Sequence, residues 1–155
     1  MTAARQGRWA ADIEGDFVVF LIGARPSKLR LLRALRDLGG RKGMFHMLDV
    51  LTKDRNSGLL HWERAGTTII QYWRSFEHLE RFANAPDPHK DAWQRYWKRV
   101  GKDNRTGIWH ETFLVRAGEY EAIYANMPPM GLARAGDMVP LKESRTARQR
   151  LREKA

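Results

Sequence analysis

The sequence contains no cysteine. Disulfides, thiolate nucleophiles, zinc ribbons and iron–sulfur clusters all need cysteine sulfur, so each of these is excluded. A chain without disulfides fits a reducing compartment, and we expect a cytoplasmic location. No apolar run approaches the roughly 18 residues of a membrane span, and the N-terminal stretch lacks the apolar segment of a signal peptide. We therefore expect neither secretion nor a membrane partner.

Signature motifs of several large enzyme classes are also missing. GxGxxG, GxxxxGK[ST] and GxSxG, which mark nucleotide-binding and acyl-transfer enzymes, do not occur. The five histidines form neither HxxxH nor HxH, and none stands four residues from a carboxylate in a helical stretch, so no metal site is predicted. Haem needs only one axial histidine and no spacing motif, so haem stays open as an alternative. No other cofactor is predicted.

Length and composition are those of one globular domain. The chain has 155 residues, of which 43% are hydrophobic and 30% charged, enough to build one core. The formal net charge is +10, and +4 of it comes from the last fourteen residues, with six basic and two acidic side chains. Because the remaining +6 is ordinary, nucleic-acid binding through the tail is the weakest functional hypothesis, and no nucleic-acid partner is expected.

Hydrophobic periodicity predicts a regular order of strands and helices. Residues 17–24 are apolar on both faces, which is typical of a strand covered on both sides. Leucine and methionine recur at helical spacing from Ser27 onward and over 44–51, and Ser75 and Asp87 are suited to cap two further helices. The remaining predicted strands, rich in β-branched and aromatic residues or flanking a glycine turn, are 59–64, 67–73, 107–115 and 119–126.

This order is that of the ferredoxin-like split βαβ pattern. We therefore expect an α+β fold in which an antiparallel sheet carries helices on one face. Helices on one side leave the other face of the sheet bare, so a second copy of the chain is expected to cover it in a dimeric α/β barrel. The predicted organisation is an N-terminal extension over 1–14, the ferredoxin-like domain over 15–128 and an extended basic tail over 129–155.

Two histidines are candidates for proton transfer, because imidazole titrates near neutrality. His89 precedes Trp93 by four residues and Tyr96 by seven, which places it on the aromatic face of its predicted helix. His110 alternates with Ile108 on one face of a predicted strand. A histidine that only caps a helix or is satisfied within the core is the alternative for both. The other histidines are weaker candidates: His46 and His78 among helical charges, and His61 beside Trp62.

Six tryptophans and four tyrosines supply large rings that either fill a core or line a pocket for a flat ligand. For most of them core packing is the simpler interpretation. A subset near the candidate histidines, with one amide, forms the predicted substrate-binding set: Tyr72, Trp73, Trp93, Tyr96, Trp97, Trp109 and Asn126.

Six short segments together resemble a known family. They are QYWRSFEHLERFA at 71–83, PH and AW at 88–89 and 92–93, GIWHET at 107–112, GEYEAIY at 118–124 and NMP at 126–128. The set is similar to that of an uncharacterised bacterial and fungal family grouped with a monooxygenase-like protein of the fumagillin pathway. The antibiotic-biosynthesis monooxygenases are more distant relatives of this family. The similarity extends over roughly residues 15 to 128.

The resemblance implies a dimeric α/β barrel with a cleft between sheet and helices, and an oxidoreductase of secondary metabolism. In the antibiotic-biosynthesis group neither metal nor flavin is needed, because the deprotonated phenolic substrate itself reduces dioxygen. The leading hypothesis is thus a monooxygenase-like enzyme for a small aromatic or polyketide-like molecule. The alternatives are a haem enzyme similar to aldoxime dehydratases, which share the fold superfamily, and a non-catalytic protein that binds haem or another small molecule in the same cleft.

Overall fold

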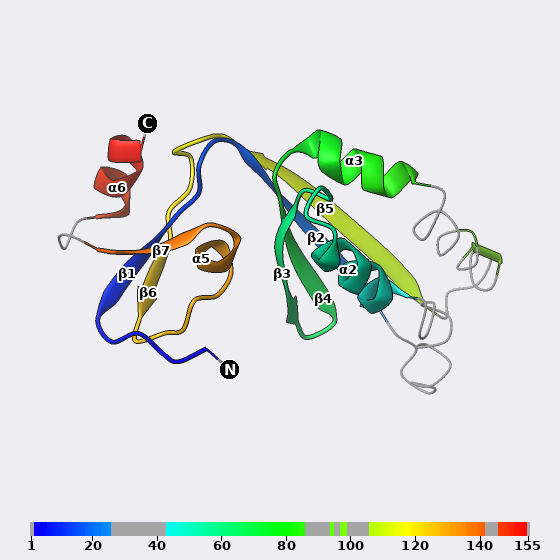
Figure 1. Cartoon of the computed structure of the whole chain (residues 1–155), viewed down its shortest axis with the longest axis horizontal. Coiled ribbons are helices and arrows are strands. Elements are labelled where there is room, and N and C mark those ends of the chain that lie inside the picture. The colour runs from blue at the N-terminus through cyan, green and yellow to red at the C-terminus, as the bar shows by residue number, and fades with distance from the viewer. Residues whose placement is uncertain are drawn as a thin grey trace.

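The computed structural model describes residues 2–25, 43–85, 94, 97–98, 106–141 and 146–154. These residues form a four-stranded sheet and a three-stranded sheet, which lie next to one another along the long axis of the molecule (Figure 1). Within the described ranges, no helix has the length and apolarity needed to cross a membrane.

The larger sheet has the ferredoxin-like topology predicted from the sequence. Its strands, all antiparallel to their neighbours, are in spatial order β3 (Leu59–Ala65), β4 (Thr68–Trp73), β2 (Phe17–Arg25) and β5 (Gly107–Val115). Helix α2 (Met44–Lys53) precedes β3 in the chain, and α3 (Phe76–Asn84) follows β4. The two crossovers of a split βαβ unit are therefore present, and the fold class is α+β as expected.

Two predicted helices fall wholly or partly on residues that are not described. The helix expected from Ser27 lies outside the described residues. Of the helix expected from Asp87, the described residues are Gln94, Trp97 and Lys98, and these are helical.

Side chains from α2 and α3 close one face of the larger sheet. Val18 of β2 and Trp73 of β4 pack with Leu51 of α2 and Leu79 of α3 in one buried cluster. Trp73 is completely buried, and its indole Nε1 donates to the side-chain oxygen of Gln71 at 2.9 Å. This face, on which α2 and α3 pack, is called the helix side below, and α2 lies in front of it in Figure 1.

The smaller sheet consists of β6 (Ile123–Ala125), β1 (Arg8–Asp12) and β7 (Asp137–Pro140) in this order. The sequence predicted that residues 119–126 would form a strand next to 107–115, and that residues 129–155 would be extended. Instead β6 pairs with β1, and 129–155 contain α5 (Leu132–Ala135), β7 and α6 (Ala147–Lys154). Tyr120 contacts the N-terminal segment just before β6: its hydroxyl accepts from the backbone N–H of Ile13 at 2.6 Å, and its ring packs edge-on against Phe17.

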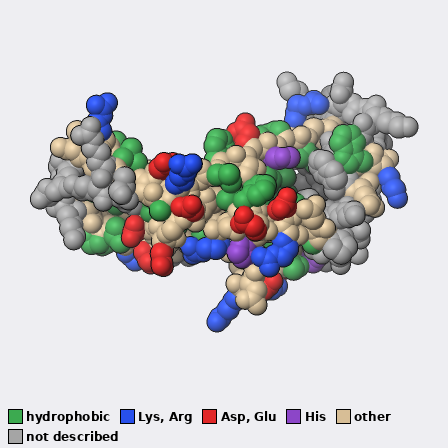
Figure 2. All heavy atoms as spheres, turned by 90° about the horizontal axis from the view of Figure 1, so that it is seen from above, with side chains coloured by type: hydrophobic (Ala, Val, Ile, Leu, Met, Phe, Trp, Pro, Cys, Tyr) green, Lys and Arg blue, Asp and Glu red, His purple; other side chains and the backbone are tan. Residues whose placement is uncertain are grey.

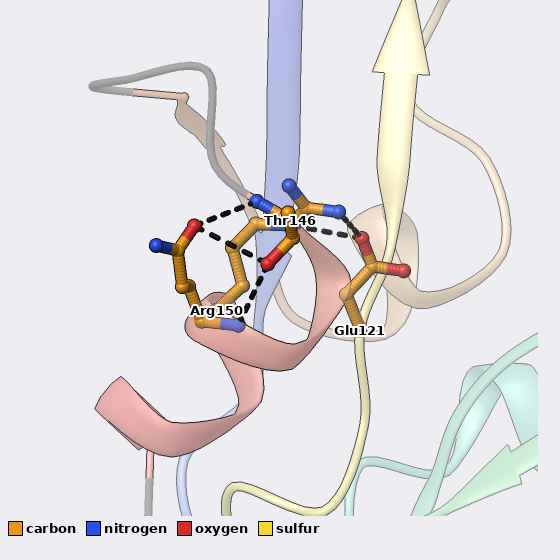
Figure 3. A network of polar contacts seen from close by, with 4 residues as sticks. Glu121, Thr146 and Arg150 are labelled. Carbon is orange, nitrogen blue, oxygen red and sulfur yellow. Dashed lines mark hydrogen bonds and ion pairs between the residues drawn. The ribbon is translucent and has the colours of Figure 1, made fainter.

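Helix α6 is fixed by a capping box and an ion pair (Figure 3). The Thr146 backbone N–H donates to the Gln149 side chain at 3.0 Å, and the Gln149 backbone N–H donates back to Thr146 Oγ1 at 3.4 Å. Arg150 pairs with Glu121, which precedes β6 in the chain. The basic tail therefore ends in a docked helix.

The face of the larger sheet opposite the helix side is covered at one end by the chain itself. Ile13, Phe17, Tyr72 and Tyr120 form a buried cluster there, and Leu132 and Ala135 of α5 pack against it. Farther along β5, Trp109 and Phe113 remain 41% and 48% exposed. Seen from above, the molecule has hydrophobic side chains exposed among charged ones near its middle (Figure 2).

Candidate functional site

His110 lies on the helix side of β5, as alternation along the strand predicts. It pairs in register with Ile22 of β2, and its imidazole contacts the ring of Phe20 with centroids 5.5 Å apart and planes at 34°. His110 is an exposed residue. An accessible imidazole next to an aromatic ring can take a proton from a flat ligand or act as a single axial ligand to haem.

The predicted partners of His110 are distributed over several elements. His89, Trp93 and Tyr96 lie outside the described residues. Trp97 is helical and 51% exposed.

Trp73 and Trp109 do not share a surface with His110. Trp73 is a core residue, enclosed between β4, α2 and α3. Trp109 lies on the opposite face of β5, where its indole covers Gly23 so closely that a Cβ at that glycine would clash with the ring. The alternation that exposes His110 on the helix side therefore turns Trp109 away from it.

Asn126 directly follows β6 and links the end of this strand to the backbone just before β1. It adopts a left-handed conformation with φ of 54°, its side-chain oxygen accepts from Gly7 N–H at 2.9 Å, and its own N–H donates to the Gly7 carbonyl at 3.0 Å. These contacts explain an asparagine at this position without a ligand.

Tyr72 belongs to a group of titratable side chains on the face opposite His110. The His61 and Tyr72 rings are nearly parallel, at 10°, with centroids 6.2 Å apart. His61 Nε2 is buried without a hydrogen-bond partner, and it lies 3.6 Å from a carboxylate oxygen of Glu63. The same Glu63 oxygen accepts a hydrogen bond from the backbone N–H of Gly131 at 3.0 Å. Tyr124 adjoins them, and its hydroxyl accepts from Ala133 N–H at 3.2 Å.

Burial determines the protonation of this group. It raises the pKa of Tyr72 to about 12, with a further contribution from the nearby Glu63 carboxylate, and it also raises the pKa of Tyr124. Burial lowers the pKa of His61, and the Arg134 guanidinium lowers it further, against an opposing effect of Glu63. At neutral pH the imidazole and both phenols are therefore uncharged.

Analysis of the sequence did not single out Glu63 or Arg134, and it ranked His61 low. The relevant signal was weak: His61 and Glu63 are two residues apart on one strand and thus share a face. Arg134 joins them only because α5 packs against β3, a contact between distant parts of the chain.

The described residues contain no group of three or more histidine, aspartate or glutamate side chains placed to hold a metal ion. Of the two histidines on the strands of the larger sheet, His110 is the accessible one, whereas His61 Nε2 is enclosed. A ligand that needs an imidazole on this sheet would therefore meet His110.

Comparison with known proteins gives a family match over most of the chain. The model of the family described as "Monooxygenase af470-like" matches residues 17–132. A curated relative, monooxygenase af470 of Aspergillus fumigatus, is 32% identical over 120 residues, which are 75% of this chain and 40% of the relative. The chain thus spans less than half of that relative.

Among solved structures, aldoxime dehydratase is similar to this chain with a TM-score of 0.47 and 13% sequence identity. The similarity covers 87% of this chain and 44% of the dehydratase chain.

Proposed function

This chain belongs to the monooxygenase af470-like family, and on that premise we propose that it is a monooxygenase for a small, electron-rich aromatic molecule. The family match is the observation that supports monooxygenation as the reaction class. The matched range includes β2 and β5, and therefore the helix-side surface around His110.

The proposed substrate-binding surface is the part of the helix side formed by β2 and β5. Phe20 offers a ring against which a flat substrate can stack, and the exposed residue His110 lies beside it. A phenol bound there would transfer its proton to the His110 imidazole, and the resulting phenolate is a much stronger electron donor than the phenol.

The proposed oxygenation needs no external reductant. The phenolate gives electrons to dioxygen, one oxygen atom forms a new bond to a ring carbon, and the O–O bond breaks. The second oxygen atom takes up the two released protons and leaves as water, while the ring is oxidised to a quinone. A simple phenol and one dioxygen molecule thus become a benzoquinone and one water molecule, so atoms and electrons balance. Metal and flavin are absent from this scheme because the substrate itself is the reductant.

The test is oxygen uptake by the purified protein with a panel of electron-rich phenols. If His110 is the base, His110→Gln should lower kcat by about 10²–10⁴-fold with a smaller effect on KM. His46→Gln is the matched control, because His46 is exposed on α2 and should leave the rate unchanged. A folded His110→Gln variant with full activity would contradict the assignment of the base. An absorption spectrum with a Soret band would favour the haem alternative.

A further inference from the structure

A hollow of about 490 Å³ opens at one corner of the larger sheet, where β3 begins, β4 ends and α3 follows. Of the eight described residues that line it, four have basic side chains: Arg55, Arg74, His78 and Arg81. Glycine and leucine supply most of the remaining wall. This hollow is called the basic hollow below.

The positive charge of the basic hollow has no paired carboxylate among the residues that the structure describes. Of these residues, no acidic one lines the hollow, and none forms an ion pair with Arg55, Arg74 or Arg81. Arg74 donates to the backbone carbonyl of Glu14 at 3.0 Å, which is a neutral acceptor. Two ion pairs lie elsewhere in the described part of the chain, Lys53 with Asp49 and Arg150 with Glu121.

The wall of the basic hollow is held in place by local contacts. The backbone N–H of Arg74 donates to the Gly58 carbonyl at 2.8 Å, and the Ser57 hydroxyl Oγ donates to the Leu51 carbonyl at 2.9 Å. The His78 ring lies against Gly58, whose φ of 80° and lack of a Cβ leave room for it, and His78 Nδ1 is 2.9 Å from Ser75 Oγ. A site whose frame is fixed before binding loses less entropy when a ligand enters.

The basic hollow lies far from His110. Leu59, at the edge of the basic hollow, pairs with Trp73 of β4, which in turn pairs with Val18 of β2. His110 pairs with Ile22, which is four residues farther along β2. That offset is about 13 Å along the strand direction, and β3 and β5 are the two opposite edges of the sheet. A ligand in the basic hollow is therefore separate from a substrate at His110, and the inference does not rest on the proposed function.

We propose that the basic hollow is a binding site for a small oxyanion, a phosphate or carboxylate group. Guanidinium groups present several N–H donors in a plane, which suits the oxygens of these anions. Arg55, Arg74 and Arg81 place three such groups around one hollow. Leu59 and Leu60, beside the arginines, offer apolar contact to the rest of an anionic small molecule.

The probes are inorganic phosphate and acetate, titrated separately at constant ionic strength against ¹⁵N-labelled full-length protein. Binding should give saturable shifts of the amide signals of Gly58, Arg74 and His78. Saturation by phosphate alone identifies a phosphate site, and saturation by acetate alone identifies a carboxylate site. Shifts that stay linear for both anions, or that spread evenly over exposed arginines, would overturn the proposal.

Single-charge variants locate the site. Arg74→Gln and Arg81→Gln should each weaken binding by about tenfold, the effect of losing one charged hydrogen bond. Arg116→Gln, at an exposed arginine after β5, removes the same charge outside the hollow and should leave the affinity unchanged. Equal weakening by Arg116→Gln would contradict the proposal. If Arg74→Gln disturbs the fold through its Glu14 contact, Arg81→Gln decides the question, because Arg81 is an exposed side chain on α3.

Discussion

At the scale of single residues, His61 is enclosed where four elements meet. Glu63 shares its strand β3, Tyr72 faces it from β4, Tyr124 lies on β6 and Arg134 on α5. Burial and the Arg134 guanidinium oppose an added proton on this imidazole, and they outweigh the Glu63 carboxylate that lies 3.6 Å from its Nε2. Protonation is therefore unfavourable in the folded chain, and this affects stability.

The free energy of unfolding should depend on pH through His61. Its pKa lies at 6.5 before any shift and is lower in the folded protein. Below about pH 6.5 the unfolded chain thus binds more protons than the folded one, and stability falls as pH falls. His61→Gln should reduce this slope in urea unfolding between about pH 7.5 and 5.5, and exposed His46→Gln should retain it. A His61→Gln variant with the wild-type slope would show that His61 is not the group responsible.

Strand alternation was sufficient to predict that His110 and Trp109 point to opposite faces, because it depends only on the local backbone. It was not sufficient to identify Trp73 as a core residue, since that depends on α2 and α3 closing over β4. The cluster around His61 was equally hidden, because Arg134 reaches it from a distant segment.

At the scale of elements, strong local patterns were predicted well and weak ones were not. Strands β2 to β5 and helices α2 and α3 lie where periodicity, turn residues and Ser75 indicated. The sequence contains the capping box of α6, a threonine followed three residues later by a glutamine. The high charge of the tail nevertheless led to the prediction of an extended segment there. β6 pairs with β1 rather than β5, and the contact of Tyr120 with Ile13 accompanies this pairing between distant parts of the chain.

Strand β5 supplies a test of the expected homodimer. Trp109 and Phe113 are exposed on the face opposite the helix side, and we expect a second copy of the chain to cover them. Phe113→Asp should therefore weaken the dimer in sedimentation at micromolar concentration. Leu114→Asp is the control, because Leu114 is 69% exposed but lies on the helix side of the same strand. A wild-type protein that sediments only as the 18.0 kDa chain would contradict the dimer.

At the scale of the whole molecule, the boundaries of the family match do not coincide with those of the two sheets. The match over residues 17–132 contains the larger sheet, β6 and the first residue of α5, whereas β1 and β7 lie outside it. The smaller sheet thus combines one strand of the family region with two flanking strands. Its α5 covers one end of the larger sheet on the face opposite His110, so the helix-side surface remains the proposed place for catalysis.

Oxygen isotopes test the proposed reaction most directly. The purified protein, without added haem, flavin or metal, is incubated with an electron-rich phenol under ¹⁸O-labelled dioxygen, and product and water are examined by mass spectrometry. Cofactor-independent oxygenation predicts one ¹⁸O atom in the quinone and the other in water, with the yield reduced in His110→Gln. A quinone without ¹⁸O, or a product formed only after haem or flavin is supplied, would contradict it.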